Sequence, residues 1–526
     1  MTVSDPLRAS AWARPLALAC TGLLLGLTQG FGLYLVSNNL SAIQGSLGAT
    51  AAEASWLVTA YFATALSSTL LLTKVRLHFG LRPFAIGGLL LFLLVSALHL
   101  LTDDLVSALA VRAALGIAAA PLSTLAIYYM MEALPQRLAP VALLAGFACL
   151  QLPGPLSRVV SPDLLEIGRW HGLFLLDVAL ALISLAAIAA LPLSPQPRRP
   201  AFDRGDLLAF PLYAVGLALL CVTISQGRLQ WWTDSPWLGE CLVGAIVCIG
   251  LYVLVDLNRA QPLLDLRWLA QPYLLRFVVA VLLFRIVLSE QTVAVVGLLT
   301  VLGQSNEQMR WLFLLASAGL LSGFVLALVV AVKRGAPLLS VLAVAMVLVA
   351  AWLDSDATAI SRPEQFWLSQ TLLSAGLGLF FSASLLQGFG PVLREGGQHM
   401  VSFLAAFSGA QFLGSLMGSA WINTLVAQRQ TAHFAALAQH LAIGDPMVTR
   451  RLAELAGSVA RWVNDPAAHA QQGLSLLNQQ LQRESFVLAY NDVFLCTAVT
   501  AAAMLLWLSV LAWRGMRRQA DAAATP

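Results

Sequence analysis

Glu290 is an acidic residue near the middle of a long apolar stretch, Phe277 to Leu302. An ionised side chain at the centre of a bilayer costs about 2.5 to 3.5 kcal/mol on insertion scales, so it needs a partner, a water-filled cavity or a function. A glutamate in such a place is suited to bind and release a proton. The alternative is a permanent ion pair with an arginine of another helix. Arg285, in the same stretch, is about 500° of helical rotation away and does not easily neutralise Glu290.

Arg158 and Asp177 lie near the ends of two other apolar stretches. Their positions favour a structural ion pair that reaches toward the membrane surface. Just before Arg158, Gly154 and Pro155 remove side-chain bulk and a backbone donor. This pair predicts a bend where another helix approaches closely.

Polar and aromatic side chains within the apolar stretches are candidates to line a wet central pathway. A mostly apolar cavity with scattered hydrogen-bonding groups suits amphipathic organic molecules. Many intramembrane amides instead bond a neighbouring helix. The candidates are Gln29, Tyr34, Asn38, Asn39, Tyr61, Gln151, Arg285, Gln291, Gln370 and Gln411.

The elements that hold these residues are membrane-spanning helices. Hydrophobic residues make up 59% of the chain and charged residues 11%, and the mean hydropathy is +0.80. Each stretch approaches the roughly 20 apolar residues that a helix needs to cross a bilayer, where all backbone groups must bond within the segment. The sequence therefore predicts an all-α membrane protein with fourteen spans. They are Pro15 to Ser37, Trp56 to Thr73, Phe84 to Leu101, Leu105 to Met131, Pro140 to Val160, Gly172 to Leu193, Leu207 to Ser225, Glu240 to Asp256, Phe277 to Leu302, Trp311 to Val332, Leu338 to Leu353, Phe366 to Phe389, Val401 to Val426 and Val493 to Trp513.

The distribution of basic residues predicts the orientation. With the N-terminus in the cytoplasm, the inner loops hold 18 lysines and arginines, whereas the short outer loops hold 4: Arg169, Arg228, Arg310 and Arg362. This bias predicts that both termini are cytoplasmic. The net charge of +4 follows from this topology, and no basic stripe indicates nucleic-acid binding.

One outer loop, residues 427–492, is long. Its apolar residues Leu452, Leu455, Val459, Trp462 and Val463 have helical spacing, which predicts an amphipathic helix. It either packs on the outer mouth of the protein or docks a partner. All six cysteines fall inside predicted spans, so no disulfide framework is expected.

Two short, basic, glycine-bearing loops, after the second and the tenth spans, suggest an internal repeat. The implied division is an N-terminal six-helix bundle (1–193), two inserted helices with their linkers (194–276) and a C-terminal six-helix bundle (277–526) that includes the long loop.

Several segments resemble the major facilitator superfamily, in particular its fourteen-span drug:proton antiporters of the EmrB/QacA type. "EASWLVTAYFATALSSTLLLTKVRLHFGLRPF" is similar to that family's second span and the loop after it, "VRAALGIAAAP" to its fourth-span motif with Arg112, and "QLPGPLSRVVSP" to its Gly-Pro antiporter motif through Gly154 and Pro155. "GRWHGLFLLDVAL" and "VLAYNDVFL" match further stretches. The resemblance covers nearly the whole chain and implies the major facilitator fold.

The chain departs from the family at two motifs. Gly32 stands where members commonly place a first-span aspartate, and Leu77 replaces the acid of the gating loop that holds Lys74, Arg76, Gly80 and Arg82. Proton coupling therefore cannot be assigned to the first span. The remaining candidates are Glu290, and Asp177 with Arg112, an arginine that in the family interacts with protonatable groups or substrate.

The resemblance implies multidrug efflux by proton antiport and alternating access in a bacterial inner membrane. It also implies contact with a periplasmic adaptor protein and an outer-membrane channel. The alternatives are a dedicated transporter of one metabolite without proton coupling, or a non-transporting receptor or scaffold. No catalytic motif indicates an enzyme, and no cofactor or metal is expected.

Overall fold

The computed structural model describes residues 13–168, 170–195, 198, 200–259, 261–334, 336–394, 399–441, 445–459 and 466–524. Every regular element in these ranges is a helix, and fourteen segments are long and apolar enough to cross a membrane. The prediction of an all-α protein with fourteen spans is confirmed. Arg169, Trp462 and Val463 lie outside the described residues.

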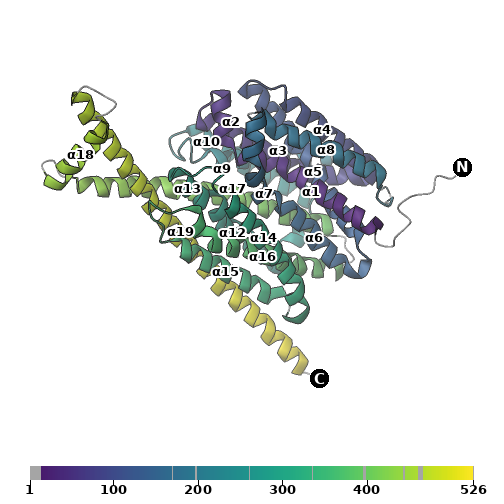
Figure 1. Ribbon diagram of the computed structural model, residues 1–526. Helices are drawn as coiled ribbons and strands as arrows, with labels where there is room; N and C mark the ends of the chain where they lie inside the picture. The colour runs from purple at the N-terminus through teal and green to yellow at the C-terminus, as the bar shows by residue number, and fades with distance from the viewer. Residues whose placement is uncertain are drawn as a thin grey trace.

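The N-terminal half packs around α5, which contacts α1, α3, α4 and α6 (Figure 1). Its core includes Tyr61 and Tyr129. Apolar side chains pointing both inward and toward lipid explain why these helices lack a strong polar face. The elements are α1 (Ala13–Ser37), α2 (Leu40–Leu47), α3 (Ala51–Phe79), α4 (Leu81–His99), α5 (Leu105–Ala133), η2 (Gln136–Leu138), α6 (Ala139–Gln151), α7 (Pro153–Gly168) and α8 (His171–Ala190).

The two inserted spans are α9 (Asp206–Gln226) and α10 (Pro236–Leu257), and a short α11 (Leu266–Leu269) follows them. Helix α9 packs against α10, against α3 of the N-terminal half and against α17 of the C-terminal half. Gln226 donates from Nε2 to the hydroxyls of Ser55 (2.9 Å) and Thr59 (3.1 Å). The insert therefore covers one side of the junction between the halves.

The C-terminal half is formed by helices α12 to α17 and α19, with a core in which Phe284 stacks on Phe380 at 3.7 Å between ring centroids. Helix α16 packs against α14 and α15, and α17 packs against α12 and α19. The elements are α12 (Pro272–Ser289), the π-helical turn η3 (Glu290–Val295), α13 (Val296–Val301), α14 (Arg310–Arg334), α15 (Ala336–Asp354), η4 (Pro363–Phe366), α16 (Trp367–Arg394), α17 (Met400–Gln439), α18 (Pro446–Val459) and α19 (Pro466–Ala524).

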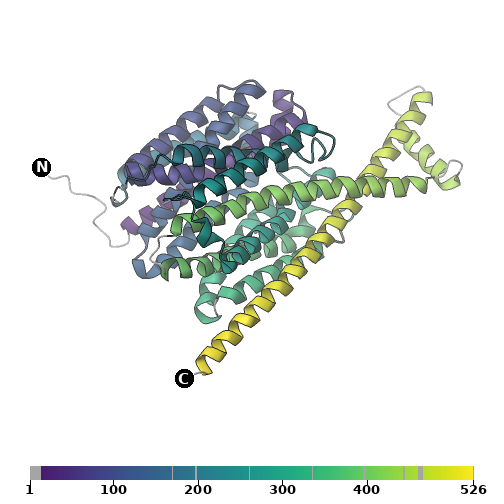
Figure 2. The same ribbon diagram turned by 180° about the vertical axis from the view of Figure 1, so that it is seen from behind.

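Helices α17 and α19 are much longer than a bilayer requires, and they project from the bundle as a hairpin whose tip carries α18 (Figure 2). Helix α18 packs on α19. Its residues Leu452 and Leu455 belong to the predicted amphipathic helix, which the structure confirms as far as Val459. Since α18 lies at the tip of the hairpin, the expectation that it covers the outer mouth of the bundle is wrong.

Two predicted spans are not continuous helices. The fifth is interrupted at Leu152, between α6 and α7, because Pro153 and Pro155 cannot donate backbone hydrogen bonds. The ninth changes to a π-helical turn at Glu290. Such turns insert an extra residue into the helix and are frequent at functional sites.

Candidate functional site

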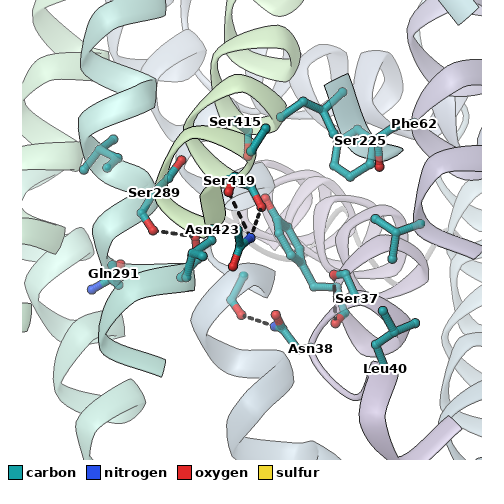
Figure 3. A pocket seen from close by; sticks show the side chains of 18 of the residues that line it. Ser37, Asn38, Leu40, Phe62, Ser225, Ser289, Gln291, Ser415, Ser419 and Asn423 are labelled. Carbon is teal, nitrogen blue, oxygen red and sulfur yellow. Dashed lines mark hydrogen bonds between the residues drawn. The ribbon is translucent and has the colours of Figure 1, made fainter. Parts of the chain in front are cut away.

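A cavity of about 580 Å³ lies between the halves, in the part of the bundle nearer the hairpin. We call it the hairpin-side cavity. Its walls come from α1, α3, α7, α12, α17 and the end of α9, and Figure 3 shows Asn38, Gln291, Ser419 and Asn423 around it. Asn38 donates from Nδ2 to the hydroxyl of Ser157 (2.6 Å) and to the carbonyl of Gly154 (3.2 Å).

A second cavity of about 240 Å³ lies on the side of the chain termini. We call it the termini-side cavity. Gln29, Tyr61, Arg76 and Gln411 line it, together with Phe147 and other aromatic side chains. The two cavities share five lining residues, which define the neck of the pathway: Tyr34, Phe62, Gln151, Arg285 and Ser415.

Most of the predicted pathway residues thus lie on cavity walls. Gln29, Tyr61 and Gln411 line the termini-side cavity, Asn38 and Gln291 the hairpin-side cavity, and Tyr34, Gln151 and Arg285 the neck. Asn39 and Gln370 line neither of these cavities. Both are buried and bonded to other helices or to their own backbone, as intramembrane amides often are.

Polar contacts join the two halves at the hairpin-side end. Asn306 donates to the side chain of Asn39 (3.0 Å) and accepts from Arg158 (3.0 Å), while Arg310 pairs with Asp163 at 2.6 Å. We call these five residues the hairpin-side lock. The predicted ion pair between Arg158 and Asp177 is wrong, because Arg158 faces this lock and the ring of Phe313 at 5.2 Å.

Glu290 is fully buried at the start of η3. Among the described residues, no amide, hydroxyl or cationic side chain donates to its carboxyl oxygens, so the alternative of an arginine partner is not what the structure shows. Its carboxyl group instead lies against that of Asp354, close enough for the two to interact electrostatically and to share a hydrogen bond when one of them carries a proton.

Asp354 is 3% exposed and is a functional candidate that the sequence did not indicate. It accepts a hydrogen bond from Gln370 Nε2 at 2.7 Å. Gln291, which lines the hairpin-side cavity, donates to the backbone carbonyl of Gln370 (3.2 Å) and to Ser374 (2.8 Å). These bonds connect the cavity wall to the two acids.

Arg112 is also fully buried. It donates to the backbone carbonyls of Gly32 (2.7 Å) and Leu57 (3.3 Å), and its guanidinium lies 4.6 Å from the centroid of the Tyr61 ring. Asp177, 1% exposed, has no hydrogen-bond partner in the described part of the chain. Its charge interacts with that of Arg112 over a longer distance. The N-terminal half thus holds an acid on α8, although Gly32 replaces the family's first-span aspartate.

Gly154 and Pro155 lie in the first turn of α7, directly after the break at Leu152, on the wall of the hairpin-side cavity. A Cβ on Gly154 would meet the Tyr34 ring at 3.6 Å, an ordinary contact. The closer approach of another helix is at Pro153, whose ring occupies the space where Gly30 of α1 has no side chain. The bend therefore lies at the predicted place, and Gly30 accommodates it.

Most residues of the predicted gating loop lie in helices: Lys74 and Arg76 belong to α3 and Arg82 to α4. The inserted segment holds this end of α3. Lys74 binds both carboxylate oxygens of Asp206 (2.6 and 2.7 Å), and Arg259 binds the same carboxylate at 2.7 Å. Arg76 turns into the termini-side cavity, 5.0 Å from the centroid of the Tyr128 ring. At Gly80 the backbone takes a φ of +91°, which favours glycine, and Arg82 is exposed. Asp206 therefore supplies a carboxylate in place of the acidic residue that the family has at the position of Leu77.

A family model described as Major Facilitator Superfamily matches residues 22–419. The chain is 24% identical to the fatty acid resistance protein FarB of Neisseria gonorrhoeae, with 94% of this chain and 96% of FarB aligned. It is 28% identical to the cephamycin export protein CmcT of Amycolatopsis lactamdurans, with 49% of this chain and 52% of CmcT aligned. It thus spans about half the length of CmcT. The crystal structure of tetrameric PepTSo2 superposes with a TM-score of 0.56 at 15% identity, covering 96% of this chain and 99% of that one.

Proposed function

Because the chain belongs to the Major Facilitator Superfamily, a family of transporters and not of enzymes, we propose that it exports hydrophobic or amphipathic compounds by proton antiport. The observation that carries the proposal is the pair of cavities that meet at one neck between the two halves. A substrate that binds at the neck is reached from either side when the halves rock against each other. FarB is named a fatty acid resistance protein and CmcT a cephamycin export protein, and these names support export of organic compounds.

The hairpin-side lock supports alternating access. Its bonds run from α7 and from Asn39, in the turn between α1 and α2, to the α13–α14 region of the other half. At the opposite end, Lys74 binds Asp206 of the insert. Contacts of this kind break and re-form when the two ends open in turn.

Glu290 is the candidate proton carrier, and Asp177 with Arg112 is the second. An acid buried in an apolar environment gains or loses a proton at a cost that depends on its neighbours. The bonds from Gln291 through Gln370 to Asp354 give the hairpin-side cavity a route by which substrate binding affects the acids.

The proposed setting is a bacterial inner membrane with both termini cytoplasmic, so that the hairpin lies in the periplasm. A periplasmic adaptor protein and an outer-membrane channel would then carry the compound onward. The projection of α17, α18 and α19 beyond the bundle supports this, as do the exposed apolar side chains of Met447 and Leu474 on the hairpin.

The test is transport in proteoliposomes that contain the purified full-length chain. A panel of amphipathic dyes and organic acids is offered with and without an imposed pH gradient. Uphill movement that requires the gradient supports antiport. Movement at the same rate without it would leave a transporter that is not coupled to protons, and no movement of any compound would favour a receptor or scaffold.

A further inference from the structure

The charged side chains on the pathway are all arginines. Arg158, Arg228 and Arg285 line the hairpin-side cavity, and Arg76 and Arg285 the termini-side cavity. No aspartate, glutamate or lysine is among the described residues that line either cavity. We propose that the substrate is an amphipathic organic anion, a molecule with an apolar body and one carboxylate or similar acidic group. This names the substrate class of the proposed exporter and rests on it for the direction of movement.

The inference depends most strongly on Arg285. It lies at the neck, and its side chain has no ion-pair or hydrogen-bond partner in the described part of the chain. Gly414 of α17 makes room for it, since a Cβ there would meet the Arg285 Cβ at 2.8 Å. A guanidinium held between the two halves of a membrane protein without a counter-charge is costly. A substrate carboxylate would supply that counter-charge through two parallel hydrogen bonds.

The other three arginines have neutral partners. Arg158 binds the Asn306 amide at 3.0 Å, Arg228 the backbone carbonyl of Asn423 at 3.3 Å, and Arg76 faces the ring of Tyr128. Neutral partners orient an arginine but do not cancel its charge, so both cavities remain positive. Such a field attracts anions and repels cations.

The acids of the protein do not reverse this field at the walls. Glu290, Asp354 and Asp177 are buried behind the lining residues and contribute to neither cavity wall. A lipophilic cation at the neck would therefore lose its hydration beside Arg285 and meet no carboxylate. Apolar side chains such as Phe62, Phe313 and Phe407 provide surface for the body of the substrate.

The test compares two probes with the same ten-carbon chain, decanoate and decyltrimethylammonium, in equilibrium binding to the purified full-length protein. We expect decanoate to bind more tightly. Arg285→Gln should weaken decanoate binding by about tenfold or more, the loss of a charged hydrogen bond, and leave the cation unchanged or improved. Arg285→Lys should retain part of the affinity. Arg450→Gln, on the exposed face of α18, is the matched control and should bind as wild type.

A second variant serves if Arg285→Gln does not fold, as judged by thermal unfolding and gel filtration. Ser415→Asp places an acid at the neck and should shift the preference from decanoate toward the cation. Tighter binding of the cation to the wild-type protein, or decanoate binding that neither variant changes, would overturn the inference. The experiments distinguish a failure of the anion assignment from a failure of the proposed export function. Arginine-dependent binding of decanoate without gradient-driven transport removes only the export function, whereas gradient-driven export of the cation alone removes only the anion assignment.

Discussion

Glu290 and Asp354 bring two buried carboxyl groups together from different helices of the C-terminal half. Two acids that share an apolar site do not both ionise easily, so they tend to hold one proton between them. Gln370 donates to Asp354, whereas the group that faces the Glu290 carboxyl is the carboxyl group of Asp354 itself. Because Asp354 has a fixed donor and Glu290 has none besides this carboxyl group, Glu290 is the residue whose replacement tests proton binding by the pair.

Glu290→Gln should abolish uphill transport driven by a pH gradient while substrate binding persists, because glutamine mimics the protonated acid. Glu290→Asp should retain part of the activity. The double variant Glu290→Gln with Asp354→Asn should be no worse than the single one, since residues that act as a unit are not additive. Glu364→Gln, at an exposed acid of η4, is the control. Normal pumping by Glu290→Gln would exclude this assignment and direct attention to Asp177 with Arg112.

The spans themselves could be predicted because a bilayer demands long apolar helices. Asp354 could not, since it comes directly after the apolar stretch that ends at Leu353 and reads as a loop residue. In the structure α15 continues through Asp354 and buries it. Its pairing with Glu290 depends on how α15 packs near η3, which is a tertiary relationship with no local sequence signal.

The sequence predicted which kinds of residue line the pathway, but it predicted less well which of them face a cavity. Gln151 and Gln291 are polar residues in apolar helices, and both line a cavity, but the similar residue Gln370 is turned toward Asp354. Helical register decides between these outcomes, and the break at Leu152 and the π-helical turn at Glu290 change it. The same limit applies to Asp206, whose role appears only when α9 packs against α3.

Asp206→Asn should impair folding and transport more than Lys74→Gln. Asp206 neutralises both Lys74 and Arg259, so its loss leaves two partly buried cations without their shared carboxylate. Lys74→Gln leaves Asp206 paired with Arg259. Membrane expression and thermal unfolding of the two variants in detergent provide the comparison. Equal effects would mean that Lys74 has a separate role in gating.

Breaking the hairpin-side lock should shift the protein toward the state that is open at the hairpin-side end. The side chain of Asp163 is 65% exposed and that of Arg310 34%, so the loss of this ion pair near the surface costs at most about 1 kcal/mol of stability. We expect Asn306→Ala with Arg310→Ala to increase labelling of a cysteine at position 419 by an impermeant reagent applied from outside. Arg362→Ala, an exposed arginine, controls for loss of charge. Unchanged labelling would mean that these bonds do not hold the halves together.

Shortening the hairpin should separate transport from delivery to an adaptor. Replacement of residues 436–478 by a short Gly-Ser linker keeps the bonds between Gln430 and Ser485 and between His433 and Asp492. We expect normal transport in proteoliposomes but loss of resistance in cells of a double-membrane bacterium. A hairpin with its sequence scrambled only on the exposed face of α18 serves as a milder variant. Loss of both activities would show that the hairpin is part of the transporter's own fold.

Export of an organic anion should respond strongly to membrane potential. One monovalent anion leaving in exchange for one proton entering transfers the equivalent of two positive charges inward, and each elementary charge gains about 2.3 kcal/mol per 100 mV. A potential set with potassium and valinomycin, negative on the side from which decanoate departs, should therefore accelerate exchange beyond the effect of the pH gradient alone. Exchange of decyltrimethylammonium for one proton is electroneutral and should not respond. A decanoate rate that is indifferent to the potential would rule out the exchange of an anion for protons.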